Sequence, residues 1–218
     1  MLLSEERALI ADYCHRLEAD GLVVGTAGNI SIRVGDRVAV TPTGVAYRTM
    51  TPEEICVIDY ETGKLIEGAY KPTSEYRLHL QVLHNTGLGS VVHTHSTYAT
   101  AVASMEGVTS LPDVHYVTAM FGGALPITEY ACYGSQLLAD RVEEALTNRT
   151  GCLLGNHGAV AAGKDLEQAY TKAQTIEWLS KVWIVTRSAG TPRILTPEQM
   201  EEASASIATY GQPIKVED

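Results

Sequence analysis

The sequence has little of what marks several classes of protein. Its 218 residues include only four cysteines and no CxxC pair, so neither a redox motif nor a cysteine-rich zinc ribbon is indicated. No run approaches the roughly 20 apolar residues of a membrane helix. The acidic start MLLSEERALI lacks a signal-peptide pattern, and unpaired thiols fit a reducing compartment. Together these absences predict a cytoplasmic protein that has no membrane partner.

Positive charge is also in short supply. The chain carries 16 Lys and Arg residues against 26 Asp and Glu residues, a formal net charge of −10. Such a surface repels the phosphate backbone of nucleic acids, so a nucleic-acid partner is not expected. A small phosphorylated ligand stays compatible, because local backbone amides and a metal ion can outweigh a distant net charge.

Apolar residues, by contrast, are plentiful. They make up 45% of the chain, and this length suits one domain with a core that needs no disulfide. Neither an internal repeat nor a linker interrupts the pattern. We therefore predict a single domain over residues 1–218.

Helical and strand patterns are interspersed along the chain. Helices are predicted over residues 4–20 (capped by Ser4), 73–84 (capped by Thr73 or Ser74), 97–105, 135–146, 165–188 and from 196 onward. Strands are predicted over residues 30–34 and 38–40, which form a hairpin, and over 55–60, 90–93, 152–154 and 159–162. Hairpins without strict βαβ alternation predict an α/β fold, with a central mainly antiparallel or mixed sheet covered by helices.

Three histidines have the spacing of a metal site. His93 and His95 stand two apart at the end of a predicted strand, so their side chains share one face. His157 lies between two short strands and is flanked by glycines. Three imidazoles with one open position are typical of catalytic zinc, and Glu75 is the leading candidate for a fourth ligand. Each of these residues, taken alone, also fits ordinary packing or, for Glu75, a favourable charge at a helix start.

Three short segments are candidates for binding an anion. GTAGNIS (25–31), TPTG (41–44) and PTS (72–74) combine small residues with hydroxyl and amide donors. Each of these segments, taken alone, is more often an ordinary turn. Neither GxxxxGK[ST] nor GxGxxG occurs, so an ATP-type phosphate loop and a dinucleotide site are not indicated.

Seven segments, in order, resemble the class II (zinc-dependent) sugar-phosphate aldolase and epimerase family. They are GTAGNIS, VTPTGVAY, PTSEYRLH, VVHTHS, HYVTAMFGG, GNHGAV and the terminal TYG, spread over residues 25–211. The ordered set is specific, although each segment alone is weak. Within the family, the resemblance is greatest to the branch that acts on L-fuculose 1-phosphate.

The resemblance implies a role for each matching residue. Glu75, His93, His95 and His157 match the zinc ligands; Co²⁺ and Mn²⁺ suit the same donors. Gly28, Asn29, Thr43, Gly44, Thr73 and Ser74 match the phosphate-binding residues. Three residues match catalytic groups: Glu75 as an acid/base, Tyr116 as a proton donor from a neighbouring subunit, and Tyr210 as part of a mobile tail.

The implied reaction is reversible cleavage of a ketose 1-phosphate, through a zinc-stabilised enediolate, to dihydroxyacetone phosphate and L-lactaldehyde. The implied assembly is a homotetramer with sites at subunit interfaces. Thr73 replaces a serine of that branch but keeps the hydroxyl, and Tyr133 stands where a phenylalanine is expected near the aldehyde. Glu75, where the 4-epimerases carry aspartate, favours the aldolases.

Other members of the same fold define the alternatives. A methylthioribulose-1-phosphate dehydratase, a keto-sugar-phosphate decarboxylase or a 4-epimerase would use a similar metal site. A non-catalytic interaction module of the adducin type is a further alternative, disfavoured because all three histidines and Glu75 are present.

Overall fold

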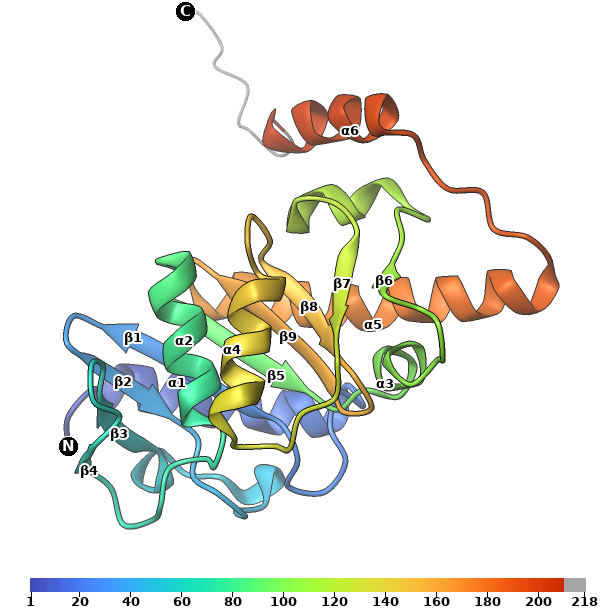
Figure 1. Ribbon diagram of the computed structural model, residues 1–218. Helices are drawn as coiled ribbons and strands as arrows, with labels where there is room; N and C mark the ends of the chain where they lie inside the picture. The colour runs from blue at the N-terminus through green and yellow to red at the C-terminus, as the bar shows by residue number, and fades with distance from the viewer. Residues whose placement is uncertain (210–218) are drawn as a thin grey trace, which may run out of the picture.

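The structure is a computed structural model that describes residues 1–209, and a single sheet runs through its centre (Figure 1). The strand order is β4-β3-β2-β1-β5-β9-β8-β7-β6, with every neighbouring pair antiparallel except β7 and β8. The strands are β1 (Asn29–Val34), β2 (Arg37–Val40), β3 (Cys56–Asp59), β4 (Leu65–Glu67), β5 (Ser90–Thr94), β6 (Ser110–Leu111), β7 (Leu125–Thr128), β8 (Gly151–Leu154) and β9 (Gly158–Gly163). The predicted mixed, mainly antiparallel sheet is confirmed.

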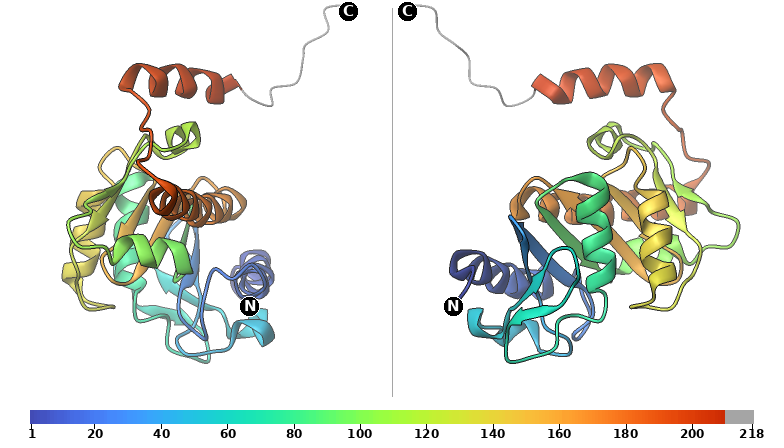
Figure 2. Two further views of the ribbon diagram at one scale, coloured as in Figure 1. Left: turned by 90° about the vertical axis from the view of Figure 1, so that its right-hand side faces the viewer. Right: turned by 60° about the vertical axis from the view of Figure 1, so that its left-hand side comes forward.

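Helices cover both faces of this sheet (Figures 1 and 2). Their bounds are α1 (Ser4–Ala19), α2 (Tyr76–Thr86), α3 (Thr97–Ala103), α4 (Gln136–Ala145), α5 (Leu166–Ala189) and α6 (Pro197–Thr209), with short 3-10 helices η1 (Tyr47–Thr49), η2 (Pro52–Glu54) and η3 (Tyr116–Phe121). Helices α2 and α4 pack side by side over one face, while α1, α3 and α5 cover the other. The result is a three-layer α/β/α arrangement.

Two apolar clusters fill the space between the layers. In β5, Val91 faces the cluster under α2 and α4, whereas Val92 faces the cluster under α1, α3 and α5. Because side chains alternate along a strand, His93 returns to the side of Val91. The sheet thus directs a histidine into the layer that contains α2.

Helix α6 lies apart from the sheet. An extended segment carries it away from the end of α5, and its main contacts are with η3 (Figure 2). Along residues 1–209, none of the helices combines the length and the apolarity needed to cross a bilayer. All four cysteines are free.

One predicted helix cap and one predicted helix start are wrong. Leu3, not Ser4, is the N-cap of α1, and it makes no side-chain capping bond. Helix α2 begins at Tyr76 rather than at Thr73, because residues 71–73 pair with the loop that follows β2. The helix predicted over 97–105 ends at Ala103.

The sequence patterns also missed strands β4, β6 and β7. Their runs are only two to four residues long and carry weak alternation. Such short segments are strands because neighbouring strands offer hydrogen bonds, and a local pattern does not record that.

Candidate metal centre and active site

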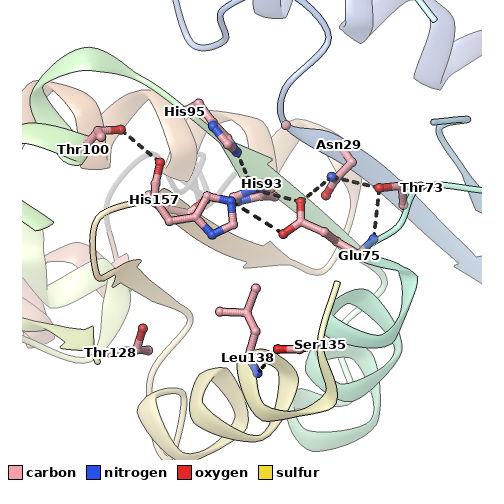
Figure 3. A network of polar contacts seen from close by, with 12 residues as sticks. Asn29, Thr73, Glu75, His93, His95, Thr100, Thr128, Ser135, Leu138 and His157 are labelled. Carbon is pink, nitrogen blue, oxygen red and sulfur yellow. Dashed lines mark hydrogen bonds and ion pairs between the residues drawn. The ribbon is translucent and has the colours of Figure 1, made fainter. Parts of the chain in front are cut away.

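Four side chains from three parts of the chain meet at one end of the sheet. Cα pairing between β1 and β5 sets Asn29 opposite His93, and His95 follows directly after β5. His157 lies in the turn between β8 and β9, and Glu75 is the N-cap residue of α2. Figure 3 shows the three imidazoles and the carboxylate turned toward one another.

The distances suit a single metal ion. One ligand atom from each of Glu75, His93, His95 and His157 lies within 4.8 Å of the others. His93 Nε2 is 3.0 Å from His95 Nε2 and 3.2 Å from Glu75 Oε2, and His157 Nε2 is 3.6 Å from Glu75 Oε1. This brings together the complete ligand set predicted from the sequence.

The donor atoms also fit a metal chemically. His93 Nδ1 lies 2.9 Å from the Ala159 carbonyl oxygen. A carbonyl only accepts, so the hydrogen is on Nδ1 and the Nε2 lone pair faces the cluster. Buried Glu75 Oε1 has no hydrogen-bond partner among the described residues. A buried carboxylate oxygen left unpaired beside three imidazoles is what a bound cation would satisfy.

The electrostatics of the cluster favour metal-ready protonation states at His95, His157 and Glu75. Burial, together with the charge of His93, lowers the pKa of His95 to about 3 and that of His157 to about 4. Burial opposes the charged forms of Glu75 and His93 as well. Their mutual attraction outweighs it, so the pKa of Glu75 is lowered and that of His93 is raised. Neutral imidazoles and an ionised carboxylate are the forms that bind divalent metals, so a bound cation would release the proton that the raised pKa favours on His93.

Glycines allow the backbone to close around these ligands. A Cβ at Gly28, whose φ is +85°, would lie 2.8 Å from the His93 carbonyl oxygen, and one at Gly158 would lie 2.0 Å from that of Thr94. Glycine is therefore needed next to His157 in the turn between β8 and β9, because the backbone of Gly158 lies too close to that of Thr94 to leave room for a side chain. The left-handed conformation in that turn belongs to Asn156, with φ 54°.

The predicted phosphate-binding residues share a cavity with the metal cluster. Two backbone hydrogen bonds join their loops: Thr73 N donates to Thr41 O at 2.9 Å and Thr43 N donates to Lys71 O at 3.0 Å. A cavity of about 350 Å³ is lined by all six, Gly28, Asn29, Thr43, Gly44, Thr73 and Ser74, together with Glu75, His95 and His157. Among residues 1–209, the lining includes no lysine or arginine, so an anion bound by these residues would contact amides, hydroxyls and a metal.

The predicted tyrosines lie elsewhere. Tyr116 begins η3, is 56% exposed and does not line this cavity. Tyr210 lies outside the described residues. Tyr133 does line the cavity mouth, and so does Tyr130, which the sequence reasoning did not identify.

The sequence reasoning also missed His79. Its side chain is fully buried and contacts Ser31 Oγ at 2.7 Å and Asn29 Oδ1 at 2.5 Å. The available signal was its position four residues after Glu75, which places it on the same helical face one turn further on.

Fold and site together define an α/β protein with a three-histidine, one-carboxylate centre that opens into a polar cavity. The sequence model of the family described as "Class II Aldolase and Adducin N-terminal domain" matches residues 8–184. The chain belongs to this family.

Individual relatives agree in length as well as in sequence. A 5-deoxy-D-ribulose 1-phosphate aldolase of Bacillus thuringiensis serovar kurstaki is 36% identical over 215 residues, 97% of this chain and 100% of that protein. An L-fuculose phosphate aldolase of Escherichia coli K12 is 35% identical over 213 residues, 94% and 95% of the two chains. A solved L-fuculose 1-phosphate aldolase superposes with a TM-score of 0.89 at 30% identity, covering 95% and 98%. The family resemblance, the fold class and the prediction of a metal-dependent class II aldolase are confirmed.

Proposed function

We propose that the chain cleaves a 6-deoxy-ketose 1-phosphate, L-fuculose 1-phosphate, reversibly to dihydroxyacetone phosphate and L-lactaldehyde. The observation that carries the proposal is the shared cavity, in which the metal cluster and six polar candidates for phosphate binding line one space. A ketose 1-phosphate has its phosphate on C1 and its carbonyl on C2. The phosphate would therefore contact the polar candidates while the carbonyl lies at the metal cluster.

The proposed cofactor is one zinc ion per subunit, held by Glu75, His93, His95 and His157; Co²⁺ or Mn²⁺ suits the same donors. When bound, it supplies Lewis-acid chemistry that polarises the substrate carbonyl and offsets the negative charge developed on cleavage. Glu75 would be the ligand that substrate replaces, so that the three histidines would hold the ion while Glu75 acts as an acid/base.

The chain's own groups would move the protons. Cleavage between C3 and C4 removes a proton from the C4 hydroxyl and delivers one to C3. We assign the first transfer to Tyr116 of a neighbouring subunit and the second to Glu75. Support for Glu75 is its position on the cavity wall, where the residue is buried but lines the space that substrate would occupy.

The phosphate-binding residues would orient the substrate without reacting. Asn29 and Thr73 are buried and hydrogen-bonded to each other at 3.0 Å, so their polar atoms are fixed before substrate arrives. Both Asn29 amide hydrogens go to Glu75 and Thr73, so the Thr73 hydroxyl is the fixed side-chain donor of this pair. A fixed donor contributes binding energy and helps to align the C3–C4 bond with the acid/base groups. Thr43 and Ser74 are exposed at the same cavity and would complete the contact.

We also propose a homotetramer with sites between subunits, in one domain spanning residues 1–218 and located in the cytoplasm. Support for shared sites is the location of Tyr116, exposed and outside the cavity of its own chain. We propose that Tyr210 closes over the site from the C-terminal tail.

A second substrate is favoured by one comparison. The relative with 36% identity is a 5-deoxy-D-ribulose 1-phosphate aldolase. This ketose, one carbon shorter, has the same C1 phosphate and C2 carbonyl, and the same bond cleavage would release dihydroxyacetone phosphate and acetaldehyde.

The test measures release of dihydroxyacetone phosphate from both ketose phosphates, with and without a chelator. Release from L-fuculose 1-phosphate that the chelator abolishes and zinc restores supports the first proposal. Preferential release from 5-deoxy-D-ribulose 1-phosphate, judged by kcat/KM, would replace it by the second. No release from either by the zinc-loaded protein would reject both and favour a dehydratase or decarboxylase.

A further inference from the structure

A buried histidine behind the metal ligands connects two strand residues to helix α2. His79 lies on α2 one turn after Glu75, and its side chain is fully buried. Its two ring nitrogens contact Ser31 Oγ and Asn29 Oδ1. Ser31 and Asn29 lie two apart on β1 and therefore share the face that looks toward α2.

The direction of each hydrogen bond can be assigned by starting from the Glu75 carboxylate. Ionised Glu75 only accepts, so Asn29 Nδ2 donates to Glu75 Oε2 at 2.9 Å and, with its other hydrogen, to Thr73 Oγ1 at 3.0 Å. Asn29 Oδ1 is then the atom that faces His79, and it can only accept. His79 must therefore donate from Nε2.

The remaining contact is consistent with this assignment. A neutral imidazole that donates from Nε2 accepts at Nδ1, and the Ser31 hydroxyl is a donor at 2.7 Å. Burial, followed by the charge of His93, lowers the pKa of His79 to about 3, so the ring is neutral at neutral pH. Every hydrogen between Ser31 and Glu75 then has a defined acceptor.

We propose that His79 is a positioning residue that fixes the Asn29 amide in the orientation that donates to both Glu75 and Thr73. Without a donor at this place, rotation of the amide by 180° would turn Oδ1 toward the carboxylate. The amide would then repel the Glu75 oxygens and lose its hydrogen bond to them. His79 thereby links the carboxylate ligand to the predicted phosphate-binding residues, an assignment that rests on the proposed function.

The first experiment measures zinc affinity by competition with a chromophoric chelator, which needs no substrate. His79→Leu removes the donor and is expected to weaken zinc binding by about 10- to 100-fold. His79→Gln restores an N–H donor and is expected to stay nearer the parent than the leucine variant. The matched control is His84→Leu on the same helix, because His84 is exposed and contacts only Tyr60 in the described hydrogen bonds and ring contacts; its affinity should equal that of the parent.

A double-mutant cycle tests whether the effect passes through Asn29. In an Asn29→Ala background, His79→Leu should change zinc affinity by no more than about twofold, since the amide it orients is gone. A loss of full size in that background would overturn the proposal and make His79 a packing residue. Parent-like affinity of His79→Leu in the unmodified background would overturn it equally.

Two measurements keep the test decisive if the leucine variant does not fold. His79→Gln must retain zinc affinity within about tenfold of the parent, and a greater loss contradicts the proposal. In the parent protein, ¹⁵N spectra of histidine should show His79 protonated at Nε2 and bare at Nδ1; the opposite tautomer rejects it. Failure of the parent to cleave either ketose phosphate would reject the proposed function without altering these zinc and tautomer results.

Discussion

The two ends of the proposed active site are held in opposite ways. At the sheet, His93 and Asn29 are at most 4% exposed, and Glu75 is fixed by bonds from several elements. At η3, Tyr116 is 56% exposed and lies beside a groove formed with α6, away from the metal cluster. Within the described residues, one chain therefore brings together the proposed metal ligands and the proposed phosphate-binding residues, while it presents its candidate proton donor outward.

This contrast suggests which residues a single chain can orient and which need a second chain. A buried carboxylate among imidazoles keeps its geometry through local bonds. An exposed tyrosine on a 3-10 helix gains a defined position only when another surface meets it. Substitutions at the two ends should consequently fail in different ways.

Glu75→Gln should have the largest effect. The amide removes one negative ligand and the proposed proton carrier, so kcat should fall by about a thousandfold, and zinc affinity should fall as well. The measurement is coupled detection of dihydroxyacetone phosphate, with Glu53→Gln, an exposed glutamate on η2, as the control. An unchanged kcat would remove Glu75 from the chemistry.

Tyr116→Phe should lower kcat by about a hundredfold while zinc affinity stays that of the parent. Tyr70→Phe, another exposed tyrosine, is the matched control. Parent-like turnover of Tyr116→Phe would show that the hydroxyl takes no part.

Mixed oligomers would break the comparison between the two ends most directly. Glu75→Gln and Tyr116→Phe chains are refolded together in equal amounts. If each site takes Glu75 from one chain and Tyr116 from its neighbour in a cyclic assembly, about a quarter of the sites should contain both intact residues and regain activity. Absence of recovery, despite demonstrated mixing, would mean that each chain uses its own tyrosine.

Thr43→Val should have a smaller effect, confined to the phosphate end. Loss of one hydroxyl contact to a charged group should raise KM about tenfold, with little change in kcat. With L-fuculose, which lacks the phosphate, parent and variant should be equally slow. Thr49→Val, at an exposed position in η1, is the control; an equal loss with both sugars would contradict phosphate binding by Thr43.

The smallest expected effect concerns Lys172, which is buried outside the proposed active site. Unlike Glu75 and His93, it has no oppositely charged partner among the causes of its pKa shift. Its Nζ donates to Thr150 Oγ1 at 2.8 Å and to Ala162 O at 3.1 Å, and burial lowers its pKa to about 8. The unfolded chain, with an ordinary lysine pKa of about 10.4, binds more protons between these values. The contribution of Lys172 to the free energy of unfolding therefore rises as the pH increases from about 8 to about 10.4.

Lys172→Met carries no such term, so its stability relative to the parent should be greatest below pH 8 and should shrink toward pH 10. Urea unfolding of both metal-free proteins at pH 7.5 and 9.5 measures this difference and cancels the ionisation of cysteines and tyrosines. Lys164→Met, at a side chain that is 72% exposed, should show no such change. A pH-independent difference for Lys172→Met would contradict a lowered pKa.

Local patterns predicted the elements with strong periodicity or clear turn residues. The hairpin around Gly35-Asp36 and the long helix α5, with Asp165 as its N-cap, formed where expected. The start of α2 did not, because pairing of residues 71–73 with the loop after β2 overrides the capping pattern at Thr73. Strands β6 and β7 were missed because both runs are short. In addition, β7 pairs with β8, which lies far along the chain, and a local pattern does not record that pairing.

By itself the sequence determined the chemical inventory: an HxH pair on a strand, a glycine-flanked histidine, a carboxylate at a helix start, and three small polar loops in a family-specific order. Only the tertiary structure decided how these meet. Cross-strand register set Asn29 beside His93, and the position of α2 next to β1 made His79 a hydrogen-bond partner of Asn29. The physical reason is that ligand types are local properties of residues, whereas donor directions arise from contacts between distant segments.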